Sequence, residues 1–224
     1  MTVGPDPHFP YLDKDKRFVF PPVIRSSGNI IAVGGNLSPG MLLSAYEQGI
    51  FPWYSEDEPL LWQSPDPRFL IFPEDLHISE SMKKILKKGI FNVVIDHDFP
   101  AVINNCAITY RPGQSGTWIT HDMIEAFIEL HRLGYVHSAE SYRDGQLVGG
   151  CYGLLLGKYF CGESMFAKEK NASKAAFLTY AQQLFAQGVA CIDCQVYTVH
   201  LASLGGRNVP RAAFLRLLRK ILKS

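Results

Sequence analysis

The chain has 224 residues, of which 47% are hydrophobic and 19% charged, with 14 prolines and 19 glycines. This length and composition predict an ordinary soluble globular protein with one sizeable core and at most a small accessory domain, and they exclude fibrous and low-complexity classes. The formal net charge of +1 excludes attraction of nucleic acid by the field of the whole molecule, so any such contact requires a local basic patch.

The N-terminal twenty residues lack the apolar region of a signal peptide, and no stretch approaches the roughly 18 apolar residues of a membrane span. The cysteines are odd in number and scattered, which is typical of reduced thiols packed as small hydrophobic side chains. They are Cys106, Cys151, Cys161, Cys191 and Cys194. We therefore expect a cytoplasmic protein with no disulfide framework and no membrane partner.

The predicted elements begin after a proline-rich, aperiodic segment over residues 1–28. The apolar run 30–33 predicts a short strand. Ser38-Pro39 then provides a cap and a favourable first residue for a helix that ends at Gly49. The segment 50–68 is rich in aromatic residues and proline, which is typical of a domain junction or a binding wall.

After residue 72 the pattern alternates between helices and strands. It predicts helices over 79–88, 99–106, 121–133, 172–187 and from 211, and strands over 91–95, 135–142, 147–155, 158–166 and 190–195. Asp144-Gly145 and Gly157 mark two hairpin turns within this region. The order fits an α+β, acyltransferase-like fold better than a doubly wound sheet.

Polar residues interrupt two apolar strands in a way that suggests a site. Glu163 lies in the strand 158–166, whereas Asp193 and Gln195 lie in the strand 190–195. Side chains two residues apart on a strand share one face, roughly 6 to 7 Å apart, so Asp193 and Gln195 can act on one bound group. The alternative is a buried polar pair that hydrogen-bonds the neighbouring backbone.

Other constellations are excluded. Cys191 and Cys194 are three apart on a predicted strand, point to opposite faces and cannot close on one metal. The run Gly162-Glu163-Ser164-Met165-Phe166 lacks the closing glycine of a nucleophile elbow. Phosphate-loop, dinucleotide and zinc-protease motifs are missing, so the sequence predicts no metal and no cofactor.

Basic side chains gather on two predicted helices. Lys83, Lys84, Lys87 and Lys88 lie at helical spacing on one side of the first helix. The second set lies on the C-terminal helix and contains Arg211, Arg216, Arg219, Lys220 and Lys223. Either set is a candidate nucleic-acid contact, and the alternative for both is plain solvated surface.

Several longer motifs occur together in the order of one family. They are Tyr46 with Gly49-Ile50-Phe51-Pro52-Trp53, Trp62 with Ser64-Pro65-Asp66-Pro67-Arg68, Gly116-Thr117-Trp118-Ile119, the run 160–166, Asn171-Ala172-Ser173-Lys174 and Asp193-Cys194-Gln195. From about Gly28 to Arg211 the chain closely resembles the bacterial leucyl/phenylalanyl-tRNA-protein transferases. The resemblance implies a small N-terminal α/β domain, residues 1–65, and a larger domain like that of GNAT-type acetyltransferases, residues 66–224.

The resemblance implies an aminoacyltransferase. That family transfers Leu or Phe, and less readily Met, from aminoacyl-tRNA to proteins that begin with Arg or Lys, which marks them for N-end rule degradation. An acetyltransferase of this fold would hold coenzyme A with a glycine-rich loop, but here Phe166 is followed by Ala167-Lys168-Glu169. We therefore expect aminoacyl-tRNA as the donor, no cofactor, and a monomer.

The resemblance also implies residue roles. Asp193 is expected to polarise the Gln195 amide, which contacts the attacking nitrogen, and Glu163 suits the cationic acceptor. The Lys83–Lys88 helix is expected to contact the acceptor stem of tRNA. Stacking on the terminal adenosine is expected of Trp53, Trp118 and Tyr46, although Tyr46 and Trp53 can equally join the domains. Candidate walls for the donor side chain, with core packing as the alternative, are Phe160, Met165, Phe166, Phe177 and Ile192.

Three departures from the family affect the expected donor pocket. Gln63 replaces an aromatic residue, Cys151 replaces a longer Met, and Thr198 replaces an Asn. Two alternatives stay open at this point. One is a non-catalytic tRNA- or peptide-binding module on the same scaffold, which would not need Asp193 and Gln195. The other is a related transferase with a different acceptor, such as a cell-wall precursor.

Overall fold

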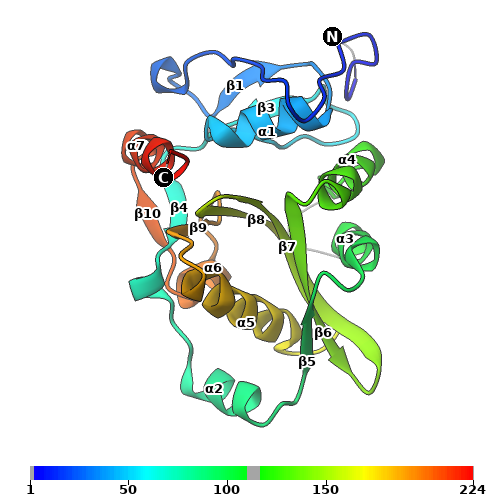
Figure 1. Ribbon diagram of the computed structural model, residues 1–224, viewed down its shortest axis with the longest axis vertical. Helices are drawn as coiled ribbons and strands as arrows, with labels where there is room; N and C mark the ends of the chain where they lie inside the picture. The colour runs from blue at the N-terminus through cyan, green and yellow to red at the C-terminus, as the bar shows by residue number, and fades with distance from the viewer. Residues whose placement is uncertain (1–2, 110–116, 224) are drawn as a thin grey trace.

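The computed structural model describes residues 3–109 and 117–223, and Gly116, which begins one of the motifs above, lies outside them. The described residues form a three-stranded sheet and a seven-stranded sheet that lie next to one another, with helices packed around them (Figure 1). The α+β class predicted from the sequence is confirmed. No helix in the described ranges has the length and apolar character needed to cross a membrane.

The three-stranded sheet is antiparallel, with the strand order β1-β3-β2. Its elements are the short helix η1 (Val23–Arg25), β1 (Ile30–Val33), α1 (Pro39–Glu47), β2 (Phe51–Pro52) and β3 (Leu61–Gln63). Ser38 precedes α1 as predicted, but its hydroxyl accepts a hydrogen bond from the Leu12 N–H and not from its own helix. The preceding arm therefore lies against α1, and residues 39–46 are all buried.

The seven-stranded sheet has the order β10-β4-β9-β8-β7-β6-β5. Its strands are β4 (Arg68–Ile71), β5 (Asn92–Ile95), β6 (Val136–Arg143), β7 (Gln146–Leu156), β8 (Tyr159–Ala167), β9 (Cys191–Asp193) and β10 (Arg207–Val209). Neighbours are antiparallel except β8 and β9, which are parallel. A parallel pair requires a crossover connection, and α5 (Ala172–Ala186) supplies it.

The remaining helices are η2 (Pro73–Asp75), α2 (Glu80–Lys87), α3 (Phe99–Ile108), α4 (His121–Arg132), α6 (Val199–Ser203) and α7 (Arg211–Ile221). Figure 1 shows α5 on one side of the large sheet and α3 and α4 on the other. Side-chain caps begin α2, α3, α4 and α6, where Ser79, Asp98, Thr120 and Thr198 each accept the N–H three residues later. These caps satisfy backbone donors that the first helical turn leaves free.

The sequence missed the shortest elements and overextended one strand. β2, β3, β4, β10 and α6 were not predicted, since segments of two to five residues leave almost no periodic signal. The strand predicted over 190–195 is β9, which ends at Asp193. It ends there because Gln195 adopts a positive φ of 63° and donates its N–H to the Asp193 side chain, outside the sheet ladder.

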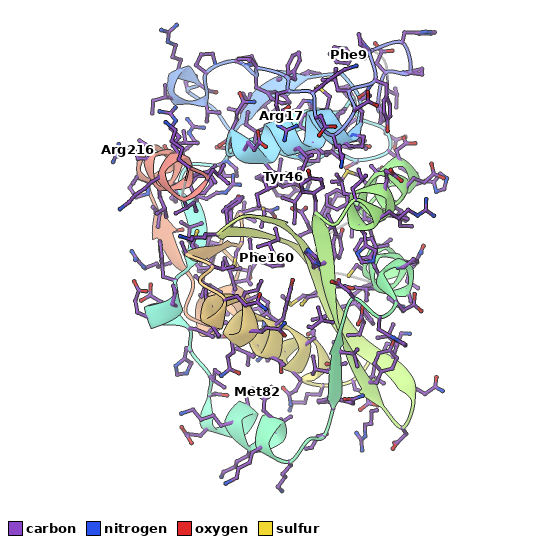
Figure 2. All side chains as sticks on the ribbon, viewed as in Figure 1. Phe9, Arg17, Tyr46, Met82, Phe160 and Arg216 are labelled. Atoms are coloured by element: carbon purple, nitrogen blue, oxygen red, sulfur yellow. The ribbon has the colours of Figure 1, made fainter. Side chains whose placement is uncertain are left out.

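The junction between the two sheets is a continuous apolar core. One buried cluster contains Tyr46 from α1, Trp62 from β3, Phe127 from α4 and Phe214 from α7. Figure 2 shows Tyr46 on the side of α1 that faces the large sheet. The turn after α1 packs tightly on α7, because a Cβ built on Gly49 would lie 2.6 Å from Leu215 Cδ2 and 3.0 Å from Phe214 Cε1.

Gly49 tests this junction, because it has a positive φ of 76° as well as the tight contact with α7. Gly134 has a φ of 79° and no atom within 4 Å of a built Cβ, so it is a matched control. We expect Gly134→Ala to cost about 1–2 kcal/mol through the backbone alone. Gly49→Ala should cost about 1–3 kcal/mol more through overpacking. Urea unfolding of both variants measures the difference, and equal costs would contradict the junction contact.

Candidate active site

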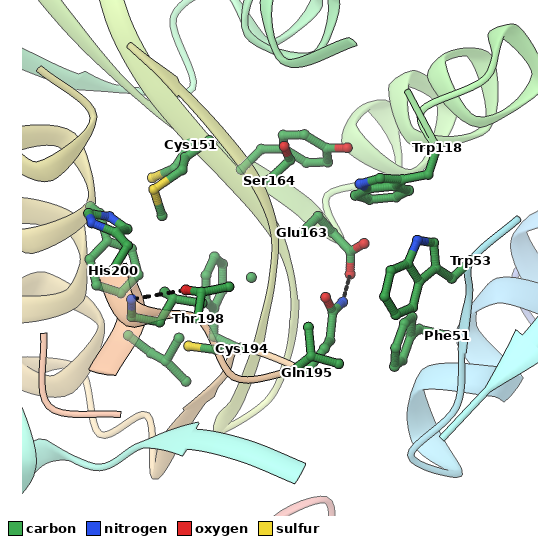
Figure 3. Close-up of a pocket in the computed structure, with 18 of the residues that line it drawn as sticks. Phe51, Trp53, Trp118, Cys151, Glu163, Ser164, Cys194, Gln195, Thr198 and His200 are labelled. Atoms are coloured by element: carbon green, nitrogen blue, oxygen red, sulfur yellow. Dashed lines mark hydrogen bonds between the residues drawn. The ribbon is translucent and has the colours of Figure 1, made fainter. Parts of the chain in front are cut away.

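A cavity of about 540 Å³ lies between the small sheet and the large sheet. Its walls come from β2, from the segment around Trp118, from β7, β8 and β9, and from α5 and α6. Figure 3 shows Trp53 and Trp118 at one end, Glu163 and Gln195 in the middle, and Cys151, Thr198 and His200 at the other end. The cavity is mostly apolar with a few polar groups, which is typical of sites for small ligands or substrate groups.

Most of the predicted aromatic and apolar candidates reach this cavity. Lining positions are occupied by Trp53, Trp118, Phe160, Met165, Phe177 and Ile192. Phe166 is a correction, because it lies in the core cluster shared with α3 and α4. Successive residues on a strand point to opposite faces, so Met165 on the cavity side sends Phe166 to the other side.

Tyr46 is a second correction, since it is completely buried and does not line the cavity. Its hydroxyl donates a 2.8 Å hydrogen bond to Glu163 Oε1, 117 residues away in the chain. Tyr46 therefore supports a cavity residue from behind and has no free face on which a base can stack.

Some lining residues were not assigned a role from the sequence. They include Phe51, Tyr152, Ser164, Cys194, Val196 and His200. Phe51 belongs to a motif already recognised, but His200 lies on the unpredicted helix α6. Its Nε2 is buried and makes no hydrogen bond with the described residues, and burial followed by the charge of Lys174 lowers its pKa.

The Asp193 carboxylate is fully buried beside the cavity and is surrounded by donors. Arg68 Nε lies 2.8 Å from Oδ1 and 2.9 Å from Oδ2, and Nη2 lies 2.7 Å from Oδ2. Tyr159 donates its hydroxyl to Oδ2 from β8. Burial alone lowers the pKa of the Arg68 guanidinium, but the charge of Asp193 outweighs this and raises it above its ordinary value.

The structure corrects the expected contact between Asp193 and the Gln195 amide side chain. Asp193 Oδ1 accepts the backbone N–H of Gln195 at 2.8 Å, because the positive φ of Gln195 turns the chain back on itself. The Gln195 side chain points elsewhere, and its Nε2 donates to Glu163 Oε1 at 3.0 Å. Glu163, Asp193 and Gln195 lie close together as predicted, because β8 and β9 are neighbours. The prediction that Asp193 and Gln195 act on one bound group from one strand face is wrong, because Gln195 lies beyond the end of β9 and Asp193 does not line the cavity.

Glu163 is the carboxylate in this cluster with a free oxygen. Tyr46 and Gln195 both donate to Oε1, whereas Oε2 is buried and has no hydrogen-bond partner in the part of the chain that the structure describes. Burial raises the pKa of Glu163 to about 7, and the hydrogen bond from Tyr46 opposes the shift. Glu163 is therefore a proton acceptor at the cavity that titrates near neutral pH.

The thiols at the cavity are poor candidates for a nucleophile. Burial raises the pKa of both Cys151 and Cys194, so they remain protonated at neutral pH. Among residues 3–109 and 117–223, no group of three or more His, Cys, Asp or Glu side chains is arranged to hold a metal ion.

The basic helix α2 lies far from the cavity lining, at the end of the molecule opposite α1 (Figure 1). All of its predicted lysines, Lys83, Lys84, Lys87 and Lys88, are exposed. Lys83 forms an ion pair with Glu80 at 2.7 Å. The structure thus presents these side chains at the surface, where phosphate groups can reach them.

Known proteins give a consistent comparison. The model of the leucyl/phenylalanyl-tRNA protein transferase family matches residues 70–219, and that of its N-terminal domain matches residues 35–66. A leucyl/phenylalanyl-tRNA–protein transferase of Syntrophus aciditrophicus is 54% identical over 209 residues, covering 93% of this chain and 87% of the relative. One of Myxococcus xanthus is 50% identical over 206 residues, covering 92% and 88%.

Among solved structures, a GCN5-related N-acetyltransferase-like protein of Streptococcus suis is 15% identical. It has a TM-score of 0.37 and covers 79% of this chain and 66% of that one.

The two family matches together include every residue that lines the cavity. The resemblance seen in the sequence and the prediction of an aminoacyltransferase are both confirmed. The chain belongs to the leucyl/phenylalanyl-tRNA–protein transferase family.

Proposed function

We propose that this protein transfers Leu or Phe, and also Met, from aminoacyl-tRNA to the α-amino group of proteins that begin with Arg or Lys. The observation behind the proposal is an apolar cavity whose middle holds Glu163 and Gln195 (Figure 3). The modified proteins would enter N-end rule degradation in the cytoplasm. We propose that this protein acts as a monomer.

We also propose that the chain divides into two domains, one around each sheet. Residues 1–65 form a small domain and residues 66–224 form a GNAT-like catalytic domain. The small sheet ends at Gln63 and the large sheet begins at Arg68. The small domain contributes Phe51 and Trp53 to the cavity, so both domains are needed for donor binding.

The donor fits the cavity along its length. The slot formed by Phe160, Met165 and Phe177 is apolar and suits a large aliphatic or aromatic side chain. In such a slot one methylene is worth only about 1–3 kcal/mol, which explains tolerance of several donors. Trp53 and Trp118 lie at the end of the cavity away from Cys151, the sheet neighbour of Met165, and offer faces for the unpaired terminal adenosine (Figure 3).

The chemistry requires positioning and one proton transfer. The neutral α-amine attacks the ester carbonyl carbon of the donor, and the bond from that carbon to the terminal ribose oxygen breaks. The attacking nitrogen loses one proton and the ribose oxygen gains one, so the tRNA leaves with a free hydroxyl group. The ester is already activated, so no covalent enzyme intermediate or cofactor is needed. The Gln195 carboxamide orients the amine, Asp193 fixes Gln195, and the carboxylate of Glu163, a residue that lines the cavity, supplies the negative charge for the cationic acceptor.

Transfer of labelled Leu from charged tRNA to matched peptides tests the function. We expect transfer to peptides that begin with Arg or Lys and none to the same peptide beginning with Ala. Gln195→Ala should reduce kcat strongly while the fold remains intact. Asp193→Ala should also abolish transfer, with a decrease in stability of about 3–5 kcal/mol, because Arg68 is left buried and unpaired. Equal transfer to all three peptides would contradict the acceptor assignment.

The raised pKa of Glu163 predicts how kcat/KM depends on pH. Because the ionised form binds the acceptor, kcat/KM should rise with pH through about 7, the pKa of Glu163. Glu163→Gln should remove this rise and leave only the titration of the peptide amine, near pH 8. A profile with the same limb near pH 7 in the variant would contradict the role.

Stability provides a second readout for the same variant. The folded pKa of Glu163 lies above its ordinary value of 4.5, so the contribution of this group to stability is fully present below pH 4.5 and is lost as pH rises through about 7. Glu163→Gln cannot ionise and should gain on the order of 3 kcal/mol relative to wild type between pH 4 and pH 8. Thermal unfolding at the two pH values measures this gain.

The α2 lysines predict where the acceptor stem lies. We expect Lys84→Ala/Lys87→Ala/Lys88→Ala to raise KM for charged tRNA with kcat unchanged. The slope of log affinity against log salt should become shallower by about 0.7–0.9 for each tRNA phosphate that the variant no longer neutralises. Arg216→Ala/Arg219→Ala/Lys220→Ala on α7 is the charge-matched control. A larger rise in KM for the α7 variant would move the tRNA-binding surface to that helix.

A further inference from the structure

Arg68 is a fully buried charged residue that does not line the cavity. It begins β4, close to the end of the small sheet. Burying a guanidinium costs several kcal/mol unless the charge is paired and its donors are used, so its contacts are informative about what it supports.

The guanidinium of Arg68 is held on every side. Its carbon lies 4.8 Å from the centre of the Phe51 ring and 4.7 Å from that of the Phe214 ring. Nη1 donates to Gly49 O at 3.2 Å, and Nε and Nη2 meet both oxygens of Asp193. One side chain thus joins the turn before β2, the helix α7 and the strand β9.

The Asp193 carboxylate transmits this constraint to Gln195. Its Oδ1 accepts the Gln195 N–H, and Gln195 has a φ of 63°, a conformation that costs a non-glycine residue about 1–2 kcal/mol. An interaction must therefore hold that backbone in place. The result is a carboxamide that lines the cavity and hydrogen-bonds Glu163 at 3.0 Å.

We propose that Arg68 is a positioning residue of the transfer reaction, which holds Asp193 so that the backbone and carboxamide of Gln195 are fixed in the cavity beside Glu163. The inference rests on the proposed function. The same guanidinium stacks on Phe51, which lines the cavity, so Arg68 aligns the wall from the small sheet with the reacting groups.

The arrangement needs an arginine and not simply a positive charge. A planar fork reaches both carboxylate oxygens and a carbonyl together and stacks between two rings, whereas an ammonium is a single point charge. Arg68→Lys keeps the buried charge for Asp193 but removes the fork. The variant should therefore fold and still misplace Gln195.

A double-mutant cycle between Arg68→Lys and Gln195→Ala tests the proposal. We expect Arg68→Lys to lower kcat about 10- to 100-fold with KM for charged tRNA and for the peptide within about threefold, because the groups that bind substrate remain. In the Gln195→Ala background the same substitution should lower kcat by less than about threefold. Equal effects in both backgrounds would overturn the proposal.

Arg211→Lys is the matched control. Arg211 is also buried, and its guanidinium donates to the carbonyls of Ser26, Gly28 and Ser64 at 2.7–2.8 Å, without touching Asp193. This variant should lose thermal stability but keep kcat. If Arg211→Lys lowers kcat as much as Arg68→Lys does, the loss of activity is a general result of replacing a buried arginine. That outcome would overturn the proposal.

Two further measurements keep the test decisive. Amide hydrogen exchange at Gln195, followed by NMR, should be at least about tenfold faster in Arg68→Lys than in Arg211→Lys. Equal exchange rates in the two variants would overturn the proposal. This readout does not depend on whether the wild type shows transfer activity. Absence of transfer by wild type would instead refute the proposed function. If Arg68→Lys fails to fold, a neutral pair replaces it in the test. The double variant Arg68→Gln/Asp193→Asn keeps hydrogen-bonding groups at both positions but buries no charge. Its kcat should be higher than that of Arg68→Gln alone.

Discussion

The buried ion pair between Arg68 and Asp193 is the interaction on which the arrangement of the cavity depends. The two side chains come from β4 and β9, neighbours in the sheet, and neither is exposed to solvent. Each charge alone would be strongly destabilising in that position. Together, with Tyr159 donating to Asp193 and Gly49 accepting from Arg68, they form a neutral unit that fixes the end of β9.

The ion pair also explains why the two carboxylates of the site, Asp193 and Glu163, have different roles. Asp193 uses both oxygens for Arg68, Tyr159 and the Gln195 backbone, so it is a support and has no oxygen left for substrate. Glu163 Oε1 accepts from Tyr46 and Gln195, and Oε2 has no hydrogen-bond partner among the described residues. Two carboxylates in one small region thus differ in role because of their hydrogen-bond partners. The free oxygen of Glu163 destabilises the fold, as expected of a group kept for binding or chemistry.

The small N-terminal sheet contributes to the site as well as covering it. Tyr46 reaches across the junction to Glu163, and Phe51 both stacks on Arg68 and lines the cavity. The helix α7, at the far end of the chain, completes the same stack with Phe214. The cavity geometry therefore depends on three segments that are distant in sequence, and a change in any one of them is expected to reach the reacting groups.

The longer elements and most of the candidate residues could be predicted from the amino-acid sequence. The turn at Asp144-Gly145 acts within a few residues, so local chemistry was enough to predict the hairpin that it closes. The alternation of polar and apolar residues in two candidate strands predicted that Glu163, Asp193 and Gln195 belong to one site. The burial of Phe166 in the core, the support of Glu163 by Tyr46 and the pairing of Arg68 with Asp193 follow from the tertiary structure alone. Those contacts join residues 117 and 125 positions apart, and neither periodicity nor local propensity contains information about partners at that distance.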